Sequence, residues 1–117
     1  MTQDQKFDLE ERTAKFGESI IEFCLKIKKN EITSPLITQL VKSSTSVGAN
    51  YCEADDAESG RDFKHKIGIC KKEARESKHF LRMFAKTNPE FTDQIRNLWQ
   101  EAKELHLIFN TIYRKVK

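Results

Sequence analysis

Two long stretches of the sequence carry apolar residues at alternating steps of four and three positions, and this rhythm limits the folds open to the chain. The first stripe runs from Phe63 to Phe84 and the second from Phe91 to Val116. Their shared period of about 3.5 residues is typical of helices whose apolar seam faces a partner helix along its whole length. The two stripes therefore predict two long amphipathic helices.

The first half of the chain predicts two further helices. In residues 8–29 the apolar positions fall at steps of four, three and four, at Phe16, Ile20, Phe23 and Ile27. Ser34 is a natural N-cap for the next helix, and Pro35 suits a first helical position because its missing N–H is not needed there. Ser59 and Asp62 form a start signal for the third. The expected helices are 8–29, 35–57, 60–86 and 90–116.

Helices of similar length joined by short connections pack as antiparallel neighbours. The sequence thus predicts an all-α fold, an up-down-up-down, left-handed four-helix bundle with helices crossing at about 20°. We expect residues 1–117 to form a single domain.

Composition excludes several classes of protein. Charged residues make up 33% of the chain, and four Gly and two Pro are too few for a linker-rich or collagen-like sequence. No apolar stretch approaches the roughly 20 residues needed to span a membrane, and because the first residues show no basic region followed by an apolar one, we do not expect a signal peptide. Three cysteines at irregular spacing fit reduced thiols better than disulfides or a metal site. We expect a cytoplasmic protein.

The net charge of +3 conceals an asymmetry along the chain. Residues 1–60 hold 7 basic and 11 acidic side chains, whereas residues 61–117 hold 14 basic and 7 acidic ones. On a helical wheel the basic residues of the last two helices gather on one flank and the acidic residues on the other. The basic flanks contain Lys64, Lys71, Arg75, Lys78, Arg82, Lys86, Arg96 and Lys103.

The basic flank of residues 64–86 extends over about 33 Å of helix, which is enough to meet several phosphates of a nucleic acid. The alternatives are an ordinary solvated flank, or one neutralised by acidic residues of a neighbouring helix or subunit. Because the Phe and Tyr residues are assigned to the core, stacking on unpaired bases is not expected. The prediction is a surface that contacts phosphates with little base readout.

Residues with catalytic chemistry do not form a recognisable constellation. Glu76 and His79 have the spacing of a di-iron helix but are predicted to face outward, and no second such pair exists. Cys24 and Cys70 are expected in the core, and Cys52 is expected to be an inert exposed thiol. The sequence predicts a non-enzymatic protein with no cofactor and no metal site.

The helix expected at 35–57 has a face that is almost free of charge. Charge depletion is typical of the core of a protein interface, so this face indicates self-association. The alternative is that small hydroxyl residues let helices approach closely within the monomer. The residues concerned are Thr38, Ser43, Ser44, Thr45 and Ser46. Trp99 and His106 lie beside the last apolar stripe, either covering a bundle edge or anchoring a contact between subunits.

One part of the chain, about residues 39–85, resembles a known family. The resemblance is carried by Thr45-Ser46-Val47-Gly48-Ala49-Asn50-Tyr51-Cys52-Glu53-Ala54, then Ser59, Asp62-Phe63, Lys66 and Lys72-Glu73-Ala74. These motifs are similar to the four helix bundle protein family. That family includes proteins encoded in intervening sequences of bacterial 23S ribosomal RNA genes, also called S23 ribosomal proteins, and accessory variability proteins of diversity-generating retroelements.

The resemblance implies a small cytoplasmic bacterial bundle. It also implies homo-oligomers, because the retroelement relatives are associated with homopentamers whose basic surface engages nucleic acid and a partner reverse transcriptase. Asn50, Glu53 and Phe63 match the family motif. We expect Asn50 and Glu53 to satisfy buried polar groups where the second and third helices meet.

The sequence departs from its relatives after Asn50, where they often carry basic residues. Here the positions include Cys52, Asp55, Asp56 and Glu58, and acidic groups repel phosphate. Two functions follow as hypotheses: a nucleic-acid-binding accessory protein of the 23S rRNA intervening-sequence type, or a homo-oligomeric adaptor that acts through protein contacts.

Overall fold

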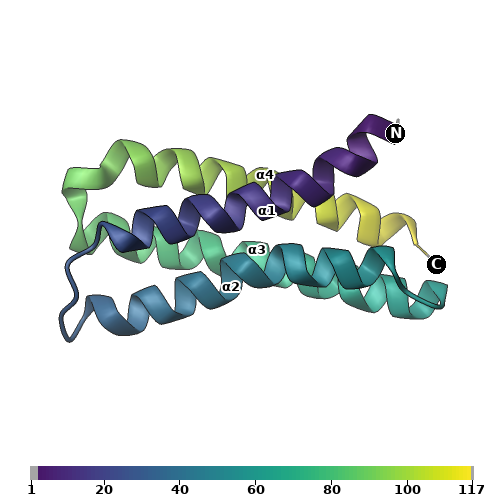
Figure 1. The fold of residues 1–117 in the computed structure, drawn as a ribbon, viewed down its shortest axis with the longest axis horizontal. Helices are drawn as coiled ribbons and strands as arrows, with labels where there is room; N and C mark the ends of the chain where they lie inside the picture. The colour runs from purple at the N-terminus through teal and green to yellow at the C-terminus, as the bar shows by residue number, and fades with distance from the viewer. Residues whose placement is uncertain (1–2, 117) are drawn as a thin grey trace.

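The computed structural model describes residues 3–116, and side chains from residue 9 onward. Within that range the chain forms α1 (Gln3–Leu25), α2 (Thr33–Asp55), α3 (Gly60–Thr87) and α4 (Thr92–Lys115), with a short 3₁₀ turn η1 (Pro89–Phe91) before α4. Successive helices run in opposite directions along a body of 44 × 24 × 20 Å (Figure 1). The predicted all-α, up-down-up-down bundle is confirmed.

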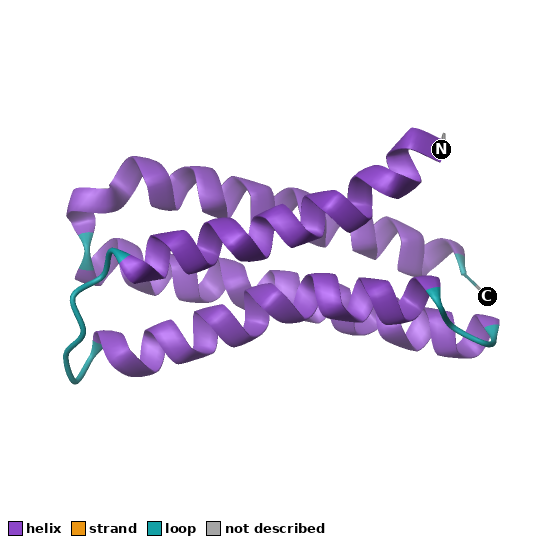
Figure 2. Cartoon of the chain, viewed as in Figure 1, coloured by secondary structure: helices purple, strands orange, loops and turns teal. Residues whose placement is uncertain are grey.

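The connections gather at the two ends of the bundle. Figure 2 shows the α1–α2 loop and the α3–α4 turn at one end, and the α2–α3 loop at the other end, beside the start of α1 and the end of α4. Among residues 3–116 no helix is both long enough and apolar enough to cross a membrane.

The core is built from the apolar positions that the sequence predicts. Phe23, Phe84 and Phe109 are fully buried, and the Phe23 ring meets Phe84 and Phe91 edge-on at centroid distances of 5.5 and 5.9 Å. Burying a large apolar side chain stabilises the fold by about 1.5–3 kcal/mol. All four helices contribute to this core, which includes Phe16, Ile20, Leu40, Val47, Ile67, Cys70, Ala74, Leu81, Ile95, Leu98, Ala102 and Leu105.

The predicted start of α3 is confirmed, but that of α2 is wrong. The Ser59 hydroxyl accepts the N–H of Asp62 at 3.0 Å, as a capping residue should. Ser34, by contrast, lies inside α2. The side-chain oxygen of Asn30 accepts the N–H groups of Ile32 and Thr33 at 2.8 and 2.9 Å, and this turn allows the helix to begin at Thr33. Pro35 still lies in the first turn, where its missing N–H costs no helical bond.

The other helix bounds differ from expectation by a turn or less, apart from α1. That helix starts at Gln3 instead of residue 8 and ends at Leu25 instead of residue 29. Ile27 remains 5% exposed although it lies beyond the helix, because a tight turn folds it back under α1. α2 ends at Asp55, and η1 delays the start of α4 to Thr92.

Small residues set the close contact between α1 and α2. A Cβ atom on Gly48 would lie 3.2 Å from the Thr13 hydroxyl, and one on Gly17 would lie 3.6 Å from Thr45 Cα. On the α3 side, the Ser43 and Ser77 hydroxyls are hydrogen-bonded at 3.0 Å. Ser43 and Ser44 therefore serve packing within the monomer, whereas Thr38 and Thr45 remain exposed.

An ion pair joins α1 to α4. The Arg12 guanidinium donates to both carboxylate oxygens of Glu101 at 2.8 and 2.7 Å, and to Glu104 at 2.9 Å. Such bidentate bonds fix geometry as well as adding energy. They raise the pKa of Arg12, chiefly through Glu101. The pKa of Glu104 is lowered by hydrogen bonds from Gln100 and then Arg12.

The core assignment can be tested by replacing a buried leucine and an exposed leucine, each with alanine. Leu81 is 0% exposed and Leu25 is 81% exposed. We expect Leu81→Ala to lower the free energy of unfolding by about 2–5 kcal/mol through lost burial and a cavity. Leu25→Ala should change it by no more than about 0.5 kcal/mol. Urea denaturation measures both, and equal effects would contradict the assigned core.

Candidate nucleic-acid interface

The candidate interface lies where α3 packs on α4, and two rows of side chains face each other across this contact. On α3, Lys64, Lys71 and Lys78 recur every seven residues. On α4, Trp99, His106 and Tyr113 do the same. We call these the lysine row and the aromatic row. Because the helices are antiparallel, the first lysine meets the last aromatic residue.

At one end of the rows, the ammonium groups of two lysines lie over the Tyr113 ring. The Nζ atoms of Lys64 and Lys71 lie 4.7 and 4.4 Å from the centre of its ring, within the range of cation–π contacts. Gly68 makes room for the ring, since a Cβ atom there would lie 3.1 Å from Tyr113 Cε2. A glycine in mid-helix, which costs about 1 kcal/mol relative to alanine, is thus explained by the aromatic residue opposite it.

His106 and Trp99 continue the row towards η1. Nδ1 of His106 is hydrogen-bonded to the Lys71 carbonyl at 3.0 Å, which ties the two helices together at the middle of the row. The half-buried Trp99 ring has Lys78 and Lys103 at 5.6 and 5.7 Å from its centre. Both distances are near the outer limit of about 6 Å for a cation–π contact.

Arg82 and Arg96 flank Trp99 from the two helices. They line a pocket of about 490 Å³ together with Ala85, Thr92, Ile95 and Trp99. Of the remaining predicted residues, Arg75 and Lys86 are exposed on α3. The structure therefore brings six of the eight predicted basic residues together around the aromatic row. We call all eight the basic surface.

The assignment of all Tyr residues to the core is wrong for Tyr113, whereas Trp99 covers the edge of the bundle, which was one of the two alternatives for it. Trp99 and Tyr113 are only half buried and alternate with the lysines. The physical reason is that both lie one position beside the buried seam of α4, where a large ring covers the edge of the α3–α4 contact while leaving part of itself outside. The seven-residue spacing of Trp99, His106 and Tyr113 was the sequence signal for this row.

Ion pairing within the chain leaves the basic surface charged. The ion pairs found within residues 9–116 join Arg12 to Glu101 and Glu104, Lys15 to Glu11, and Lys66 to Glu53. None of these involves the eight residues. Neutralisation by a neighbouring helix of the same chain, one of the alternatives for the basic flank, is therefore not observed in the part of the chain that carries described side chains.

The motif residues do not play the expected buried role. Asn50 donates to the Ser46 carbonyl of its own helix at 2.8 Å. The Glu53 side chain is 58% exposed and pairs with Lys66 at 3.0 Å, and this contact raises the pKa of Lys66. The Asn50 side chain is half buried and the Glu53 side chain is exposed, so Glu53 links α2 to α3 from the solvent side. Phe63 is half buried against the core.

Groups with catalytic or ligating chemistry are dispersed. Glu76 and His79 are exposed, as predicted from the wheel. Among the described residues, no cluster of three or more His, Cys, Asp or Glu side chains could hold a metal ion. Cys24 and Cys70 are buried and Cys52 is exposed, as predicted.

Fold and site together define a small antiparallel helical bundle with one basic, aromatic-lined face. The sequence of residues 5–111 matches the family of 23S rRNA-intervening sequence proteins, and the chain belongs to that family. A similar solved structure is that of a protein of unknown function from the S23 ribosomal protein family of Bacteroides thetaiotaomicron. It is 24% identical, with a TM-score of 0.81 over 92% of this chain and 99% of that one. No curated protein matches the chain.

The three thiols should differ sharply in reactivity. Burial raises the pKa of Cys24 to about 11 and that of Cys70 to about 12, so both stay protonated at pH 8. We expect a disulfide reagent at pH 8 to modify Cys52 alone in the folded protein, and Cys52→Ser to abolish the fast reaction. Two or three fast thiols in the native state would contradict this.

The same pKa shifts predict the direction of the pH dependence of stability. A buried thiol with a raised pKa contributes its full stability below about pH 8.5, the pKa of the thiol in the unfolded chain. Above that pH the unfolded chain loses the thiol proton while the folded chain keeps it, so this contribution is lost as the pH rises towards the pKa in the folded state. The free energy of unfolding should therefore fall between about pH 8.5 and pH 11. Cys24→Ser and Cys70→Ala variants should show a smaller fall, measured by urea denaturation at each pH.

Proposed function

We propose that this protein is a non-enzymatic accessory protein that holds nucleic acid by its phosphates along the basic surface of α3 and α4. The observation that supports this most is the set of eight cationic side chains on α3 and α4, six of them around the aromatic row and all outside the described ion pairs. A surface of one sign in this geometry attracts a polyanion and raises its rate of association.

The geometry favours contact with the backbone over contact with base edges. The cations from Lys64 to Lys86 extend over about 33 Å, comparable to several phosphate spacings. Lysine and arginine at such spacing neutralise phosphates and release counterions, so affinity should fall steeply with salt. A helical bundle of this width offers no single protruding recognition helix, and sequence preference should therefore be weak.

The charge map supports one end of this surface as the place where binding should centre. Glu53, Asp56 and Glu58 lie at the α2–α3 end of the bundle, and Lys66 is already paired there. Negative charge at that end repels phosphate. Binding should therefore centre on the η1 end, around Arg82, Lys86 and Arg96.

Family membership supports RNA as the first ligand to test. The family is described by its link to intervening sequences of 23S ribosomal RNA. A structured RNA hairpin is consequently the natural probe, with DNA of the same length as the comparison.

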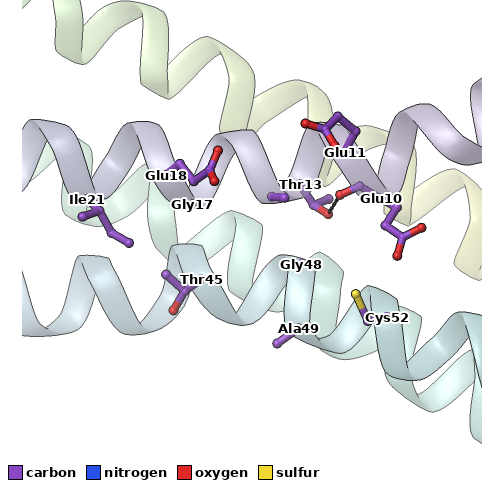
Figure 3. Close-up of a pocket in the computed structure, with 11 residues that line it drawn as sticks. Glu10, Glu11, Thr13, Gly17, Glu18, Ile21, Thr45, Gly48, Ala49 and Cys52 are labelled. Atoms are coloured by element: carbon purple, nitrogen blue, oxygen red, sulfur yellow. Dashed lines mark hydrogen bonds between the residues drawn. The ribbon is translucent and has the colours of Figure 1, made fainter.

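A second candidate function is that of a homo-oligomeric adaptor, and the groove between α1 and α2 favours it. Figure 3 shows this groove, which has a volume of about 700 Å³. Its floor is formed by small residues and its rim carries Glu10, Glu11 and Glu18, while Ile21 is 40% exposed. An acidic, partly apolar groove is complementary to the basic surface of another copy.

The two functions are separated by charge reversal at the centre of the basic surface. We expect Arg75→Glu with Lys78→Glu to weaken RNA binding at least about tenfold and to reduce the slope of log affinity against log salt by about two. The matched control, Lys15→Glu with Lys42→Glu, makes the same change in net charge on α1 and α2. It should alter affinity by no more than about twofold.

Light scattering on the same variants completes the comparison. Lost RNA binding with unchanged mass supports the nucleic-acid function. Loss of assembly with unchanged RNA binding supports the adaptor instead, and a monomeric mass for the unmodified chain would remove the adaptor. If the unmodified chain does not bind RNA at about 50 mM salt, where electrostatic binding is strong, the proposed function is wrong.

A further inference from the structure

The pocket beside Trp99 differs from the rest of the basic surface because it forms a cavity that is lined by both cationic and apolar side chains. Its volume is about 490 Å³, within the range of small-molecule sites. Ile95 and Ala85 supply apolar walls, the Trp99 ring supplies an aromatic one, and Arg82 and Arg96 stand at the rim from two different helices. Phosphate contacts alone would need only the exposed charges and no aromatic cavity.

A pocket that combines an aromatic wall with guanidinium groups from two helices suits one chemical unit in particular. A nucleotide combines a flat base, which stacks on aromatic rings, with phosphates on either side, which arginine binds through paired N–H donors. A base inside a continuous duplex cannot reach such a pocket, because both of its faces are covered by its neighbours. Only an unpaired nucleotide can present its base here.

The lysines near Trp99 leave the ring available. Lys78 and Lys103 lie 5.6 and 5.7 Å from its centre, whereas the lysines at Tyr113 lie 4.7 and 4.4 Å away. Contacts at the outer limit of the cation–π range are weak, so a base could displace these ammonium groups towards its own phosphates. The Tyr113 end is the poorer site because its ring is held more closely and the acidic α2–α3 end is near.

We propose that the Trp99 pocket takes one unpaired nucleobase, stacked on the indole ring, with the adjoining phosphates held by Arg82 and Arg96. This inference rests on the proposed function and adds a substrate class to it. The preferred ligand is a structured RNA that contains a bulged or single-stranded nucleotide. The bulk of the basic surface then contacts the flanking backbone without selecting sequence.

The sole tryptophan of the chain makes the pocket directly observable. Two RNA hairpins of equal length serve as probes, one fully paired and one with a single unpaired adenosine in its stem. We expect the bulged hairpin to quench Trp99 fluorescence markedly and the paired hairpin to quench it little at equal occupancy, with occupancy measured independently by labelled RNA.

Variants at Trp99 test whether stacking produces the preference. Trp99→Leu should weaken binding of the bulged hairpin roughly tenfold, the scale of losing one base–aromatic stack, and that of the paired hairpin less than about twofold. Trp99→Phe keeps a ring and should retain most of the preference. Circular dichroism shows whether each variant is folded, and Trp99→Phe supplies the test if Trp99→Leu is not.

The outcomes distinguish failure of the nucleobase pocket from failure of the proposed nucleic-acid binding. Equal quenching by both hairpins, or equal weakening of both by Trp99→Leu, would overturn the nucleobase pocket while leaving phosphate binding intact. Salt-sensitive binding of both hairpins with no preference would do the same. If neither hairpin binds the unmodified chain, the proposed function itself fails and the pocket inference fails with it.

Discussion

The lengthwise contact between α3 and α4 is the constraint on which the rest of this molecule depends. Both helices repeat their buried positions about every 3.5 residues, so the positions that flank the seam repeat every seven. The lysine row and the aromatic row are direct consequences of this repeat. Because the helices are antiparallel, the two rows pair in opposite chain order: Lys64 lies beside Tyr113 at one end, and Lys78 lies beside Trp99 at the other. A functional surface can thus arise from the same periodicity that builds the core.

The opposite side of the bundle is organised differently. α1 and α2 approach through glycine and small residues, and the groove above them has an acidic rim. Arg12 of α1 binds Glu101 and Glu104 of α4, so these two carboxylates are paired on the α1 side of α4. This arrangement holds acidic side chains of α4 at a distance from its own basic flank. The molecule therefore has faces of opposite charge, which suits binding of a polyanion on one face and contact with another copy on the other.

Much of the fold could be predicted from sequence, because burial follows apolar periodicity and the stripes were long. Helix ends were harder: Asn30 organises the start of α2 through its side chain, and the more conventional signal of Ser34 with Pro35 pointed two residues too far. The basic residues could be placed on a flank, since a wheel gives direction around a helix. It does not give the neighbour across the seam, so Tyr113 was assigned to the core, and the lysines that lie over Trp99 and Tyr113 were not predicted.

The motif residues illustrate a further limit. Asn50 and Glu53 occupy family positions, but a motif match indicates which residues recur and not which way their side chains point. Here Asn50 bonds to its own helix and Glu53 meets Lys66 on the surface. Their contribution is local to α2 and to its contact with α3. The proposed function therefore rests on the basic surface of α3 and α4 and not on Asn50 or Glu53.

Chemical footprinting of lysines tests the central claim most directly, that nucleic acid lies along the α3–α4 contact. The chain is acetylated with and without a structured RNA, and each lysine is quantified by mass spectrometry. We expect RNA to protect Lys71, Lys78, Lys86 and Lys103 and to leave Lys15, Lys28 and Lys42 as reactive as in the free chain. Protection of the lysines on the α1–α2 side, or equal protection of both sets, would contradict it.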